Sequence, residues 1–570
     1  MLILGISALD NNCCAMLYED NKVLAAIAEE RLTRVKMQAG FPSRAIEKVL
    51  EMTGKTVADI DKVAYPFFDW KEEAKRISGT YVRNMAYNIR TDTPAASKAW
   101  HQTRFSQWAA QAVADHRKYN QELDDGLKSL GLFDKLQRVE HHLAHHACAY
   151  FCSPFYGEGE KSLVLSLDWY GGGIAGAVAI AHPNGDFERL TSFDYPHSLG
   201  LFYAQVTGAL GFKMSRHEGK IVGLAAYGDP NILYDKVRGR FSISDGDFKY
   251  NSGMDDRFVK DLAKRYSRED VAAVWQKVLE DVVQEVVGYY IDRYNLDRVV
   301  MAGGVAANVK MNQRVFEIPG VNGIYVHQAM GDDGTGTGAA LWVAHTHDNL
   351  TPEFKLPNVY LGPGYTDEEI EAALKRNGVK ARKYKDIEKA IARRLHDGKV
   401  VARFNGRMEY GPRALGNRSI LYHCKEPEVN KWLNDQLKRT EFMPFAPACL
   451  YEERETCFKN MAGAEYAAKF MTITFDGTDF FNETAPAASH VDGTARPQLV
   501  SEDINPSFYR IIKEYQKLSG LPNIINTSFN MHEEPIVCTP DDAIRAYQQG
   551  NIHFLAIGNF LASSEEDLGE

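Results

Sequence analysis

The chain opens with three short apolar runs separated by two polar turns, MLILGISALDNNCCAMLYEDNKVLAAIA (Met1–Ala28). The runs Leu2–Ala8, Cys13–Tyr18 and Val23–Ala28 have the length of strands. The segments between them, Asp10–Asn12 and Glu19–Asn21, have the composition of tight turns. Three strands joined in this way predict an antiparallel meander at the start of the chain.

The same pattern returns in SLVLSLDWYGGGIAGAVAIAHPNGDFERLTSF (162–193), with expected strands at Ser162–Trp169, Ile174–Ala181 and Phe187–Phe193. The turns are Gly171–Gly173 and Pro183–Gly185. Two copies of one pattern predict an internally duplicated domain. Such duplication is typical of actin-like and sugar-kinase-like α/β folds, in which phosphate groups bind in the cleft between the two halves.

Segments outside the two copies predict the remaining organisation. Residues from about 70 to 135 have helical spacing and few glycines, which indicates a helical insertion, and Asp270–Tyr294 is a further expected helix. The strand Arg298–Ala302 leads into Gly303-Gly304 and a helical Val305–Val315, an arrangement suited to a phosphate or ribose. Prolines and glycines cluster near 350–365, so we expect one domain over residues 1–355 and an α/β domain over 356–570.

Composition narrows the class of protein. The 570 residues carry 66 basic and 76 acidic side chains, scattered along the chain, for a net charge of −10. This pattern argues against a nucleic-acid-binding or membrane-surface protein. Eight cysteines show no disulfide or metal-binding spacing, and the first residues do not resemble a signal peptide. No apolar run reaches membrane-spanning length, so a cytoplasmic protein is expected.

A histidine cluster, EHHLAHH (140–146), is the first candidate site. His141 and His145 are four residues apart and therefore share one helical face, as two metal-ligating imidazoles require, and His142 and His146 form a second such pair. Two isolated histidines at this spacing more often only cap a helix or face solvent, but four histidines in seven residues weaken that alternative. Two aspartates beside glycine-rich turns complete a set suited to iron, zinc or manganese: Asp168 and Asp332.

Two charged, glycine-containing stretches are candidate anion sites. In RHEGKIVGLAAYGD (216–229), Lys220 is a candidate phosphate ligand and Asp229 a candidate base, although such a loop is as often only solvated. NGRMEYGPRALGNRS (405–419) places three arginines among glycines after the expected strand Val400–Phe404. For any single arginine an internal salt bridge is the alternative. The clustered cations favour an anion pocket: Arg407, Arg413, Arg418, Lys438 and Arg496.

Seven motifs follow one another along the chain: HHLAH, HEGKIVGLAAYG, GGVAANVKMN, GRMEYGPRALGNRSI, MPFAPACL, HVDGTAR and NTSFN. With them the chain, from Leu2 to about Leu561, closely resembles the O-carbamoyltransferases of the nodulation-factor, cephamycin and aminoglycoside pathways. The resemblance implies an actin-like first domain similar to the transfer factor of tRNA threonylcarbamoyl-adenosine synthesis (TsaD-like). It implies a second domain similar to the adenylate-forming enzyme of that pathway (YrdC-like).

The resemblance also implies the chemistry. ATP, with Mg²⁺, and carbamoyl phosphate are expected to form carbamoyl-adenylate in the second domain, and the first domain is expected to transfer the carbamoyl group to a hydroxyl of a small natural product. Fe²⁺, with Zn²⁺ and Mn²⁺ as alternatives, is the expected metal at His141, His145, Asp168 and Asp332. No nucleic acid or membrane partner is expected, and homodimerisation is left open.

The family motifs assign further roles, which we state as expectations. Nucleotide binding falls on Gly303, Gly304 and Asn308. The expected catalytic residues are Asp229, Lys220 and Asn11, with Asp229 as our candidate base; the alternatives for Asp229 are that it orients the acceptor or ends the turn after Gly228. Besides the five clustered cations, the expected ligands of carbamoyl phosphate and the adenylate are Lys36, Asn526, Ser528, Asn530 and His532.

The chain departs from the family at three places. Lys36-Met37 stands where a Lys-His pair is usual, so only the lysine is kept. Asn11 and Asn12 stand where a His-Asp pair is usual, and an amide binds a phosphate but does not relay a proton. His532-Glu533 replaces a basic residue followed by glycine, so phosphate binding is expected to weaken as pH rises past about 6.5, the unperturbed His value. Two alternatives remain: a small-molecule kinase of actin-like fold, which would form ADP, and a non-catalytic regulator.

Overall fold

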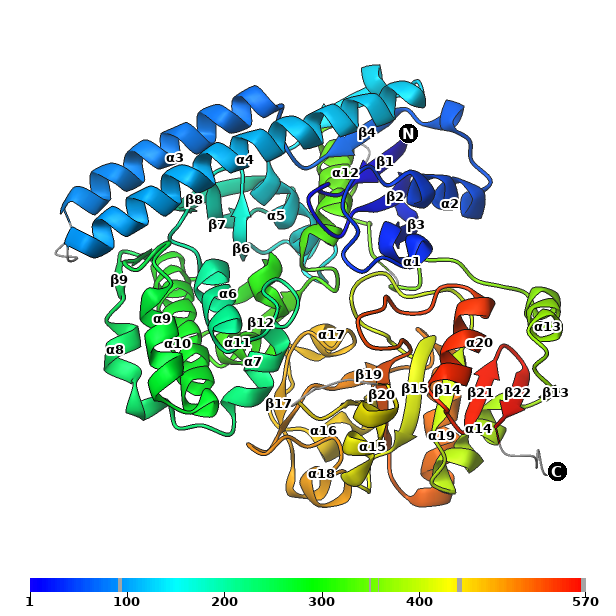
Figure 1. Cartoon of the computed structure of the whole chain (residues 1–570). Coiled ribbons are helices and arrows are strands. Elements are labelled where there is room, and N and C mark those ends of the chain that lie inside the picture. The colour runs from blue at the N-terminus through cyan, green and yellow to red at the C-terminus, as the bar shows by residue number, and fades with distance from the viewer. Residues whose placement is uncertain (91–94, 348–349, 357, 438–442, 565–570) are drawn as a thin grey trace.

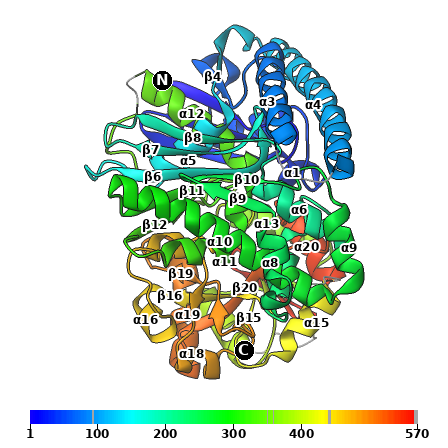
Figure 2. The same cartoon turned by 90° about the vertical axis from the view of Figure 1, so that its left-hand side faces the viewer.

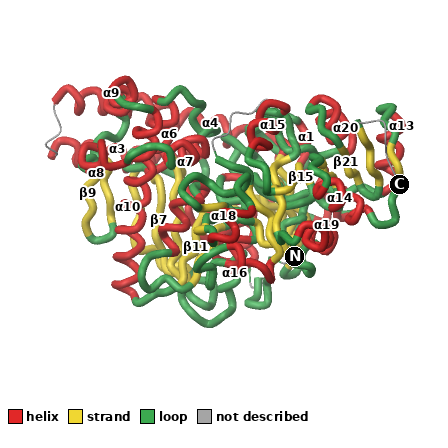
Figure 3. The backbone as a smooth tube through the Cα atoms, turned by 90° about the horizontal axis from the view of Figure 1, so that it is seen from below, coloured by secondary structure: helices red, strands yellow, loops and turns green. Residues whose placement is uncertain are grey.

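A computed structural model describes residues 1–570 except 91–94, 348–349, 357, 438–442 and 565–570. Two five-stranded sheets lie in the N-terminal part and one eight-stranded mixed sheet in the C-terminal part (Figure 1). Seen from below, β7 (Ile174–Ala181) and β11 (Arg298–Ala302) of the N-terminal part lie to one side of β15 (Arg418–His423) and β21 (Phe554–Ile557) of the C-terminal part (Figure 3). None of the helices among the described residues has the length and apolar character needed to cross a membrane.

The first sheet has the strand order β3-β2-β1-β4-β5. Strands β1 to β3 form the antiparallel meander predicted from the opening sequence, and β4 and β5 add to it in parallel. Its strands are β1 (Leu2–Ile6), β2 (Cys14–Glu19), β3 (Lys22–Ala28), β4 (Lys62–Tyr65) and β5 (Leu136–Arg138).

The second sheet repeats the first in topology, with the order β8-β7-β6-β11-β12. Again three antiparallel strands form a meander, and two further strands follow in parallel on the side of the first strand. The identical order confirms the internal duplication and the actin-like α/β arrangement. Its strands are β6 (Ser162–Gly171), β7 (Ile174–Ala181), β8 (Phe187–Asp194), β11 (Arg298–Ala302) and β12 (Gly323–Val326).

Helices α5 (His141–Phe151) and α12 (Thr335–Thr346) pack against each other between the two sheets. Side chains from both sheets meet them in one apolar cluster, for example Met16 of β2 and Val300 of β11. The helices approach so closely that a methyl group on Gly338 would overlap the carbonyl oxygen of Ala144. Glycine at this position therefore sets the distance between the helix that carries the histidines and the helix that follows Asp332.

The predicted insertion is a pair of long helices, α3 (Trp70–Arg90) and α4 (Ala95–Ser129), lying side by side along the top of the molecule (Figure 1). Aromatic side chains of α4 pack on the second sheet, where Trp108 lies with its ring centroid 4.2 Å from that of Tyr195. His116 of α4 makes a 2.7 Å hydrogen bond with the Tyr170 hydroxyl on β6. The insertion thus covers the end of the β6–β7 hairpin.

The C-terminal sheet has the order β13-β22-β21-β14-β15-β20-β16-β19 and mixes parallel with antiparallel pairs. Helices α14 and α19 cover one face with a separate apolar core. The sheet agrees with the expected α/β class, and the domain division at residues 355 and 356 remains a prediction. The strands are β13 (Ala381–Lys383), β14 (Val401–Phe404), β15 (Arg418–His423), β16 (Ala446–Leu450), β19 (Gln498–Val500), β20 (Asn523–Ser528), β21 (Phe554–Ile557) and β22 (Phe560–Ser563).

The longest of the remaining helices, α10 (Arg268–Tyr294), carries the buried Trp275 and packs against the second sheet on the side away from the insertion (Figure 2).

Short hairpins are β9 (Phe241–Ser244) with β10 (Asp247–Tyr250), and β17 (Phe475–Asp476) with β18 (Thr494–Ala495). The remaining helices are α1 (Glu29–Thr33), α2 (Ser43–Thr53), α6 (Leu199–Ala209), α7 (Glu218–Ala225), α8 (Tyr234–Arg238), α9 (Arg257–Arg265), α10 (Arg268–Tyr294), α11 (Val309–Phe316), α13 (Asp367–Arg376), α14 (Ile387–His396), α15 (Glu428–Gln436), α16 (Arg454–Cys457), α17 (Glu465–Ala468), α18 (Asp479–Thr484), α19 (Pro506–Ser519) and α20 (Pro540–Gln549).

Candidate metal centre and the loop that contacts it

The two predicted histidine ligands lie on one face of α5. Glu140 caps the helix by accepting a 2.7 Å hydrogen bond from the Leu143 amide, which fixes the start of the helix one residue before His141. The four-residue spacing then brings the Nε2 atoms of His141 and His145 within 3.2 Å of each other. Both rings are buried.

Asp168 reaches the histidines from an irregular part of β6. The pairing register with β7 shifts between Leu167 and Gly171, so Asp168 lies where the regular hydrogen bonding between β6 and β7 is interrupted. Its Oδ1 atom accepts hydrogen bonds from the backbone amides of Trp169 (2.7 Å) and Gly304 (3.2 Å). Its Oδ2 atom lies 3.4 Å from Nε2 of His141 and 3.5 Å from that of His145. The backbone therefore orients this carboxylate toward the histidines.

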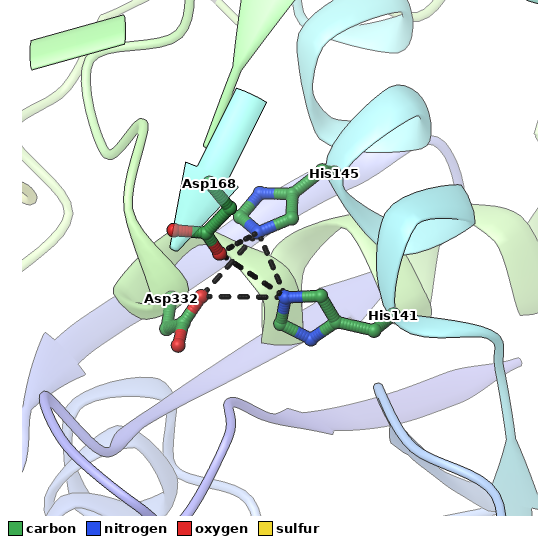
Figure 4. Close-up of side chains that lie close together, drawn as sticks. All are labelled: His141, His145, Asp168 and Asp332. Atoms are coloured by element: carbon green, nitrogen blue, oxygen red, sulfur yellow. Dashed lines mark hydrogen bonds and ion pairs between the residues drawn. The ribbon is translucent and has the colours of Figure 1, made fainter. Parts of the chain in front are cut away.

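Asp332 completes the cluster from the glycine-rich turn before α12. Its Oδ1 atom lies 3.6 Å from Nε2 of His141 and 3.3 Å from Nε2 of His145. One ligand atom from each of the four residues falls within 4.8 Å of all the others, and Figure 4 shows the side chains converging. The structure thus brings together all four residues predicted as metal ligands.

The electrostatics of the cluster fit a cation. Burial raises the pKa of Asp332 well above its usual value, and the charge of Asp168 adds to this effect. Burial also acts to raise the pKa of Asp168, but hydrogen bonds and charges of His141 and His145 outweigh it and hold that pKa well below its usual value. The buried carboxylate of Asp168 and the partly buried one of Asp332 repel each other and lie beside two imidazole nitrogens, which makes a donor set suited to a divalent metal.

The second histidine pair of the motif has a structural role. The Nδ1 atom of His142 lies 2.9 Å from the Ser166 hydroxyl, and Nε2 of His146 lies 3.1 Å from that hydroxyl and 3.3 Å from the Ala177 carbonyl oxygen. Burial lowers the pKa of His142 to about 3 and that of His146 well below its usual value. These neutral rings fasten α5 to the second sheet.

The arginine-rich loop of the C-terminal part lies against the turn that carries Asp332. The Tyr410 hydroxyl donates a 2.6 Å hydrogen bond to the Asp333 carbonyl oxygen and lies 3.0 Å from the Thr337 hydroxyl. Arg31, from the N-terminal part, donates a 3.1 Å hydrogen bond to the Gly411 carbonyl oxygen. The motif GRMEYGPRALGNRSI (406–420) is therefore in direct contact with the turn that carries Asp332.

Glu409 holds this loop in shape. Its Oε1 atom accepts hydrogen bonds from the backbone amides of Leu415 (2.7 Å), Asn417 (2.8 Å) and Arg418 (3.2 Å). Neither Glu409 nor Tyr410 was predicted from the sequence to have a role. The only available signal was their place inside an otherwise arginine- and glycine-rich motif.

The predicted anion-binding arginines occupy different environments. Arg418 is fully buried and donates hydrogen bonds to four backbone carbonyls, including those of Asn405 and Pro363. Arg407 is exposed, contacts the carbonyls of Gly362 and Leu361, and lines an open cavity of about 440 Å³. The ligand roles remain predictions. Arg413 and Arg496 are half-buried, and Lys438 lies outside the described residues.

The remaining predicted ligands of the C-terminal part lie near Arg418 and in the loop that follows β20. Asn526 is buried and donates hydrogen bonds to the Gln498 side chain (2.7 Å) and the Ala414 carbonyl (3.2 Å). Ser528 pairs with Ser419 across β20 and β15, and Asn530 donates to the carbonyls of Met531 and Glu534. These contacts place the residues beside the arginine-rich loop, and their binding roles remain predictions.

Glu533 connects the two parts of the chain. Its φ of 60° lies in the left-handed region, and its carboxylate contacts Lys213 (3.1 Å), Arg216 (3.2 Å) and His217 (3.0 Å). The His217 hydrogen bond, together with Lys213 and the charge of Lys36, lowers the pKa of Glu533 to about 2. His532 lies 3.9 Å from the same carboxylate, and the charge of Lys36 acts on it, so both of these predicted ligands lie near Glu533.

The other predicted residues are positioned as follows. Gly304 contacts Asp168 through its amide, and Gly303 has a φ of 92° that suits glycine. The Asn308 side chain caps α11 by accepting from the Met311 amide and also pairs with Gln276. The nucleotide-binding roles remain predictions.

The three predicted catalytic residues lie in different surroundings. Lys220 is buried on α7, with its ammonium 5.9 Å from the Phe212 ring centroid. Asp229 is exposed and accepts a 3.0 Å hydrogen bond from the Asn231 amide, which is a turn-capping contact. Asn11 lies in the first turn, where its amide donates to Asp10. These roles also remain predictions.

Comparison with known protein families decides the assignment. A model described as "Carbamoyltransferase N-terminus" matches residues 2–341, and one described as "Carbamoyltransferase C-terminus" matches residues 392–564. The chain belongs to the carbamoyltransferase family. This carbamoyltransferase is an enzyme of the transferase class, as its motifs predicted, and it carries a four-residue candidate metal cluster.

Individual relatives agree with the family models. The carbamoyltransferase is 33% identical over 614 residues to an uncharacterized protein of Synechocystis, covering 98% of this chain and 96% of that one. It is 30% identical to nodulation protein NolNO of Sinorhizobium fredii, over 96% of this chain and 78% of that protein. A crystal structure of HypF from T. kodakarensis gives a TM-score of 0.32 at 14% identity, over 62% of this chain and 49% of that one.

Proposed function

We propose that the protein is an ATP-dependent O-carbamoyltransferase that forms carbamoyl-adenylate and passes its carbamoyl group to a hydroxyl of a small natural product. Carbamoyl phosphate, ATP and one water would give carbamoyl-adenylate, phosphate and pyrophosphate, and transfer would release AMP. The observation that carries the proposal is the 2.6 Å hydrogen bond from Tyr410 to the Asp333 carbonyl. It joins the arginine-rich loop directly to the metal-cluster turn, so a labile intermediate need not leave the protein.

The roles of the residues follow from the charges of the substrates. Carbamoyl phosphate and ATP are polyanions, so the clustered cations would offset their mutual repulsion and orient the reacting groups. A divalent metal held by His141, His145, Asp168 and Asp332 would supply Lewis-acid charge that stabilises phosphate and carbonyl oxygens. The iron assignment, the association of Mg²⁺ with ATP and the cytoplasmic location belong to this proposal.

Product analysis tests the proposal. The full chain is incubated with ATP, Mg²⁺, carbamoyl phosphate and a panel of hydroxyl compounds, with omission of carbamoyl phosphate as control. AMP, pyrophosphate and phosphate are expected in equal amounts, together with a carbamate ester. Formation of ADP would support the kinase alternative instead, and absence of turnover with every hydroxyl compound would support a non-catalytic regulator.

Tyr410→Phe should uncouple the two half-reactions. The variant keeps the aromatic ring but loses the hydroxyl contacts to Asp333 and Thr337. Such hydrogen bonds contribute about 0.5–1.5 kcal/mol each, or about 1–3 kcal/mol for the two, so the yield of carbamate ester per pyrophosphate should fall by roughly 5- to 150-fold. Pyrophosphate release itself should stay near the wild-type rate.

The matched control for this substitution is Tyr234→Phe, which removes a hydroxyl bonded to Asp281 on a different part of the surface. The control should leave the ester yield unchanged. Equal yields from Tyr410→Phe and the wild type would show that the contact does not couple the two parts.

A further inference from the structure

Glu73 is a buried carboxylate that the proposed function leaves unused. It lies in the first turn of α3, where the helical insertion begins, and only 1% of its surface is exposed. Its Oε1 atom accepts a 2.9 Å hydrogen bond from the Phe68 amide. Its Oε2 atom is buried and has no hydrogen-bond partner among the described residues. A buried oxygen of this kind is costly unless a donor arrives from elsewhere.

The unpartnered oxygen faces the glycine turn beside the metal cluster. A methyl group on Gly172 would lie 3.3 Å from Oε2 of Glu73, and one on Gly171 would overlap the His141 ring. Glu73 and His141 therefore pack against neighbouring residues of the same turn. Helix α3 is held there because Gly173 lies against the Arg76 backbone, so the carboxylate has a fixed position near the cluster.

The charges around Glu73 suit proton transfer at neutral pH. Burial raises the pKa of Glu73 to about 7, although the Phe68 amide and the charges of Arg76 and His141 act to lower it and Glu140 acts to raise it. Efficient general bases have a pKa near the working pH. The other ionisable groups that face it are Tyr65 of β4 and Tyr170 of β6, and their pKa values are raised mainly by burial.

We propose that Glu73 is the general base that accepts the proton of the acceptor hydroxyl, an inference that rests on the proposed carbamoyl transfer. The O–H bond breaks and its proton passes to Oε2 of Glu73. The hydroxyl oxygen forms a bond to the carbamoyl carbon, and the bond from that carbon to the AMP phosphate oxygen breaks, with its electron pair leaving on AMP. The helical insertion thus gains a role, because it carries the base. Asp229, the base expected from the sequence, is exposed and caps a turn.

Glu73→Gln tests the inference, with nucleophiles that differ in their need for a base. The full chain receives ATP, Mg²⁺, carbamoyl phosphate and a molar concentration of either glycerol or hydroxylamine, because hydroxylamine attacks without a base at neutral pH. The variant should form carbamoyl glycerol on the order of 100-fold more slowly than the wild type. Hydroxyurea is the product with hydroxylamine. Because only the base is lost, the rates of pyrophosphate release and of hydroxyurea formation by the variant should stay within about twofold of wild type.

Two control variants and one pH measurement separate a base from a packing role. Glu72→Gln changes the neighbouring, solvent-facing carboxylate and should behave as wild type. Glu73→Asp keeps a carboxylate and should retain part of the glycerol reaction if the amide variant is poorly folded. The wild-type glycerol rate should fall as pH drops below about 7, because Glu73 then holds a proton, whereas the rate of Glu73→Gln should not.

The possible failures are distinguishable. Wild-type carbamoyl-glycerol rates in Glu73→Gln would overturn the role of Glu73 alone, and so would a parallel loss of glycerol and hydroxylamine products, which indicates a packing role. Failure of the wild type to carbamoylate glycerol, with hydroxyurea still formed, would overturn hydroxyl transfer and this inference together. Failure of the wild type to release pyrophosphate would overturn the proposed adenylation.

Discussion

His141→Ala is expected to remove the bound metal and to lower carbamoyl transfer by more than about 100-fold. Loss of a residue that merely supports a metal ligand already costs about 10–100-fold in metal affinity or activity, and His141 is a predicted ligand itself. The variant leaves Asp168 and Asp332 facing each other with one imidazole fewer. Metal content is measured by elemental mass spectrometry, and transfer as hydroxyurea formed per minute.

The control for the histidine variant is His182→Asn, which changes a partly exposed imidazole that pairs with Glu188 far from the cluster. It should keep both metal and activity. Pyrophosphate release by His141→Ala reports whether the C-terminal part is still folded and active. Full metal content and full transfer in His141→Ala would show that the cluster neither binds the metal nor takes part in carbamoyl transfer.

Gly338→Ala is expected to destabilise the protein by about 3 kcal/mol or more, at the upper end of the range for overpacking. The added methyl group would overlap the Ala144 carbonyl oxygen, and a backbone atom between two packed helices has little freedom to move. Separation of α12 from α5 would also move Asp332 away from His141 and His145. We therefore expect a lower unfolding midpoint in denaturant together with reduced metal content.

Gly219→Ala is the matched control, because no atom lies within 4 Å of the position where its methyl group would be built. Alanine there should leave the unfolding midpoint unchanged or raise it slightly, since alanine favours helix by up to about 1 kcal/mol over glycine. An unchanged midpoint and metal content in Gly338→Ala would contradict the close packing of α5 and α12.

Much of the fold could be predicted from the sequence because the signals are local. Apolar runs bounded by turn residues predicted both meanders, and the expected strands Ile174–Ala181 and Arg298–Ala302 have the bounds of β7 and β11. The strand expected at Ser162–Trp169 extends to Gly171, because a register shift keeps the chain paired beyond the irregular segment. The expected helix at Val305–Val315 begins only at Val309, after a short 3-10 turn over Gly304–Ala307.

The metal cluster was predictable for two reasons of different kinds. Helical spacing alone places His141 and His145 on one face. Asp168 and Asp332 are 164 residues apart, and no local rule brings them together. Their glycine-rich surroundings and the family resemblance identified them. The topology of the second sheet explains the outcome, since Asp168 lies near the end of β6 and Asp332 in the turn after β12, and these strands run in the same direction on either side of β11.

Other site residues could not be predicted, because their roles depend on contacts across the fold. Glu72 and Glu73 are adjacent in a charged helix, where the prior favours solvent exposure for both. Packing of α3 on the Gly171–Gly173 turn buries Glu73 alone. Tyr410 likewise gains its role from Asp333, which is 77 residues away in the chain.

The most direct test of the account follows one oxygen atom. The protein is given ATP, hydroxylamine and carbamoyl phosphate labelled with ¹⁸O in its carbonyl oxygen, and the AMP product is analysed by mass spectrometry. Formation of carbamoyl-adenylate makes a carbamoyl oxygen part of the AMP phosphate, so the account predicts ¹⁸O in AMP together with labelled hydroxyurea. Unlabelled AMP, or ADP as the nucleotide product, would contradict it.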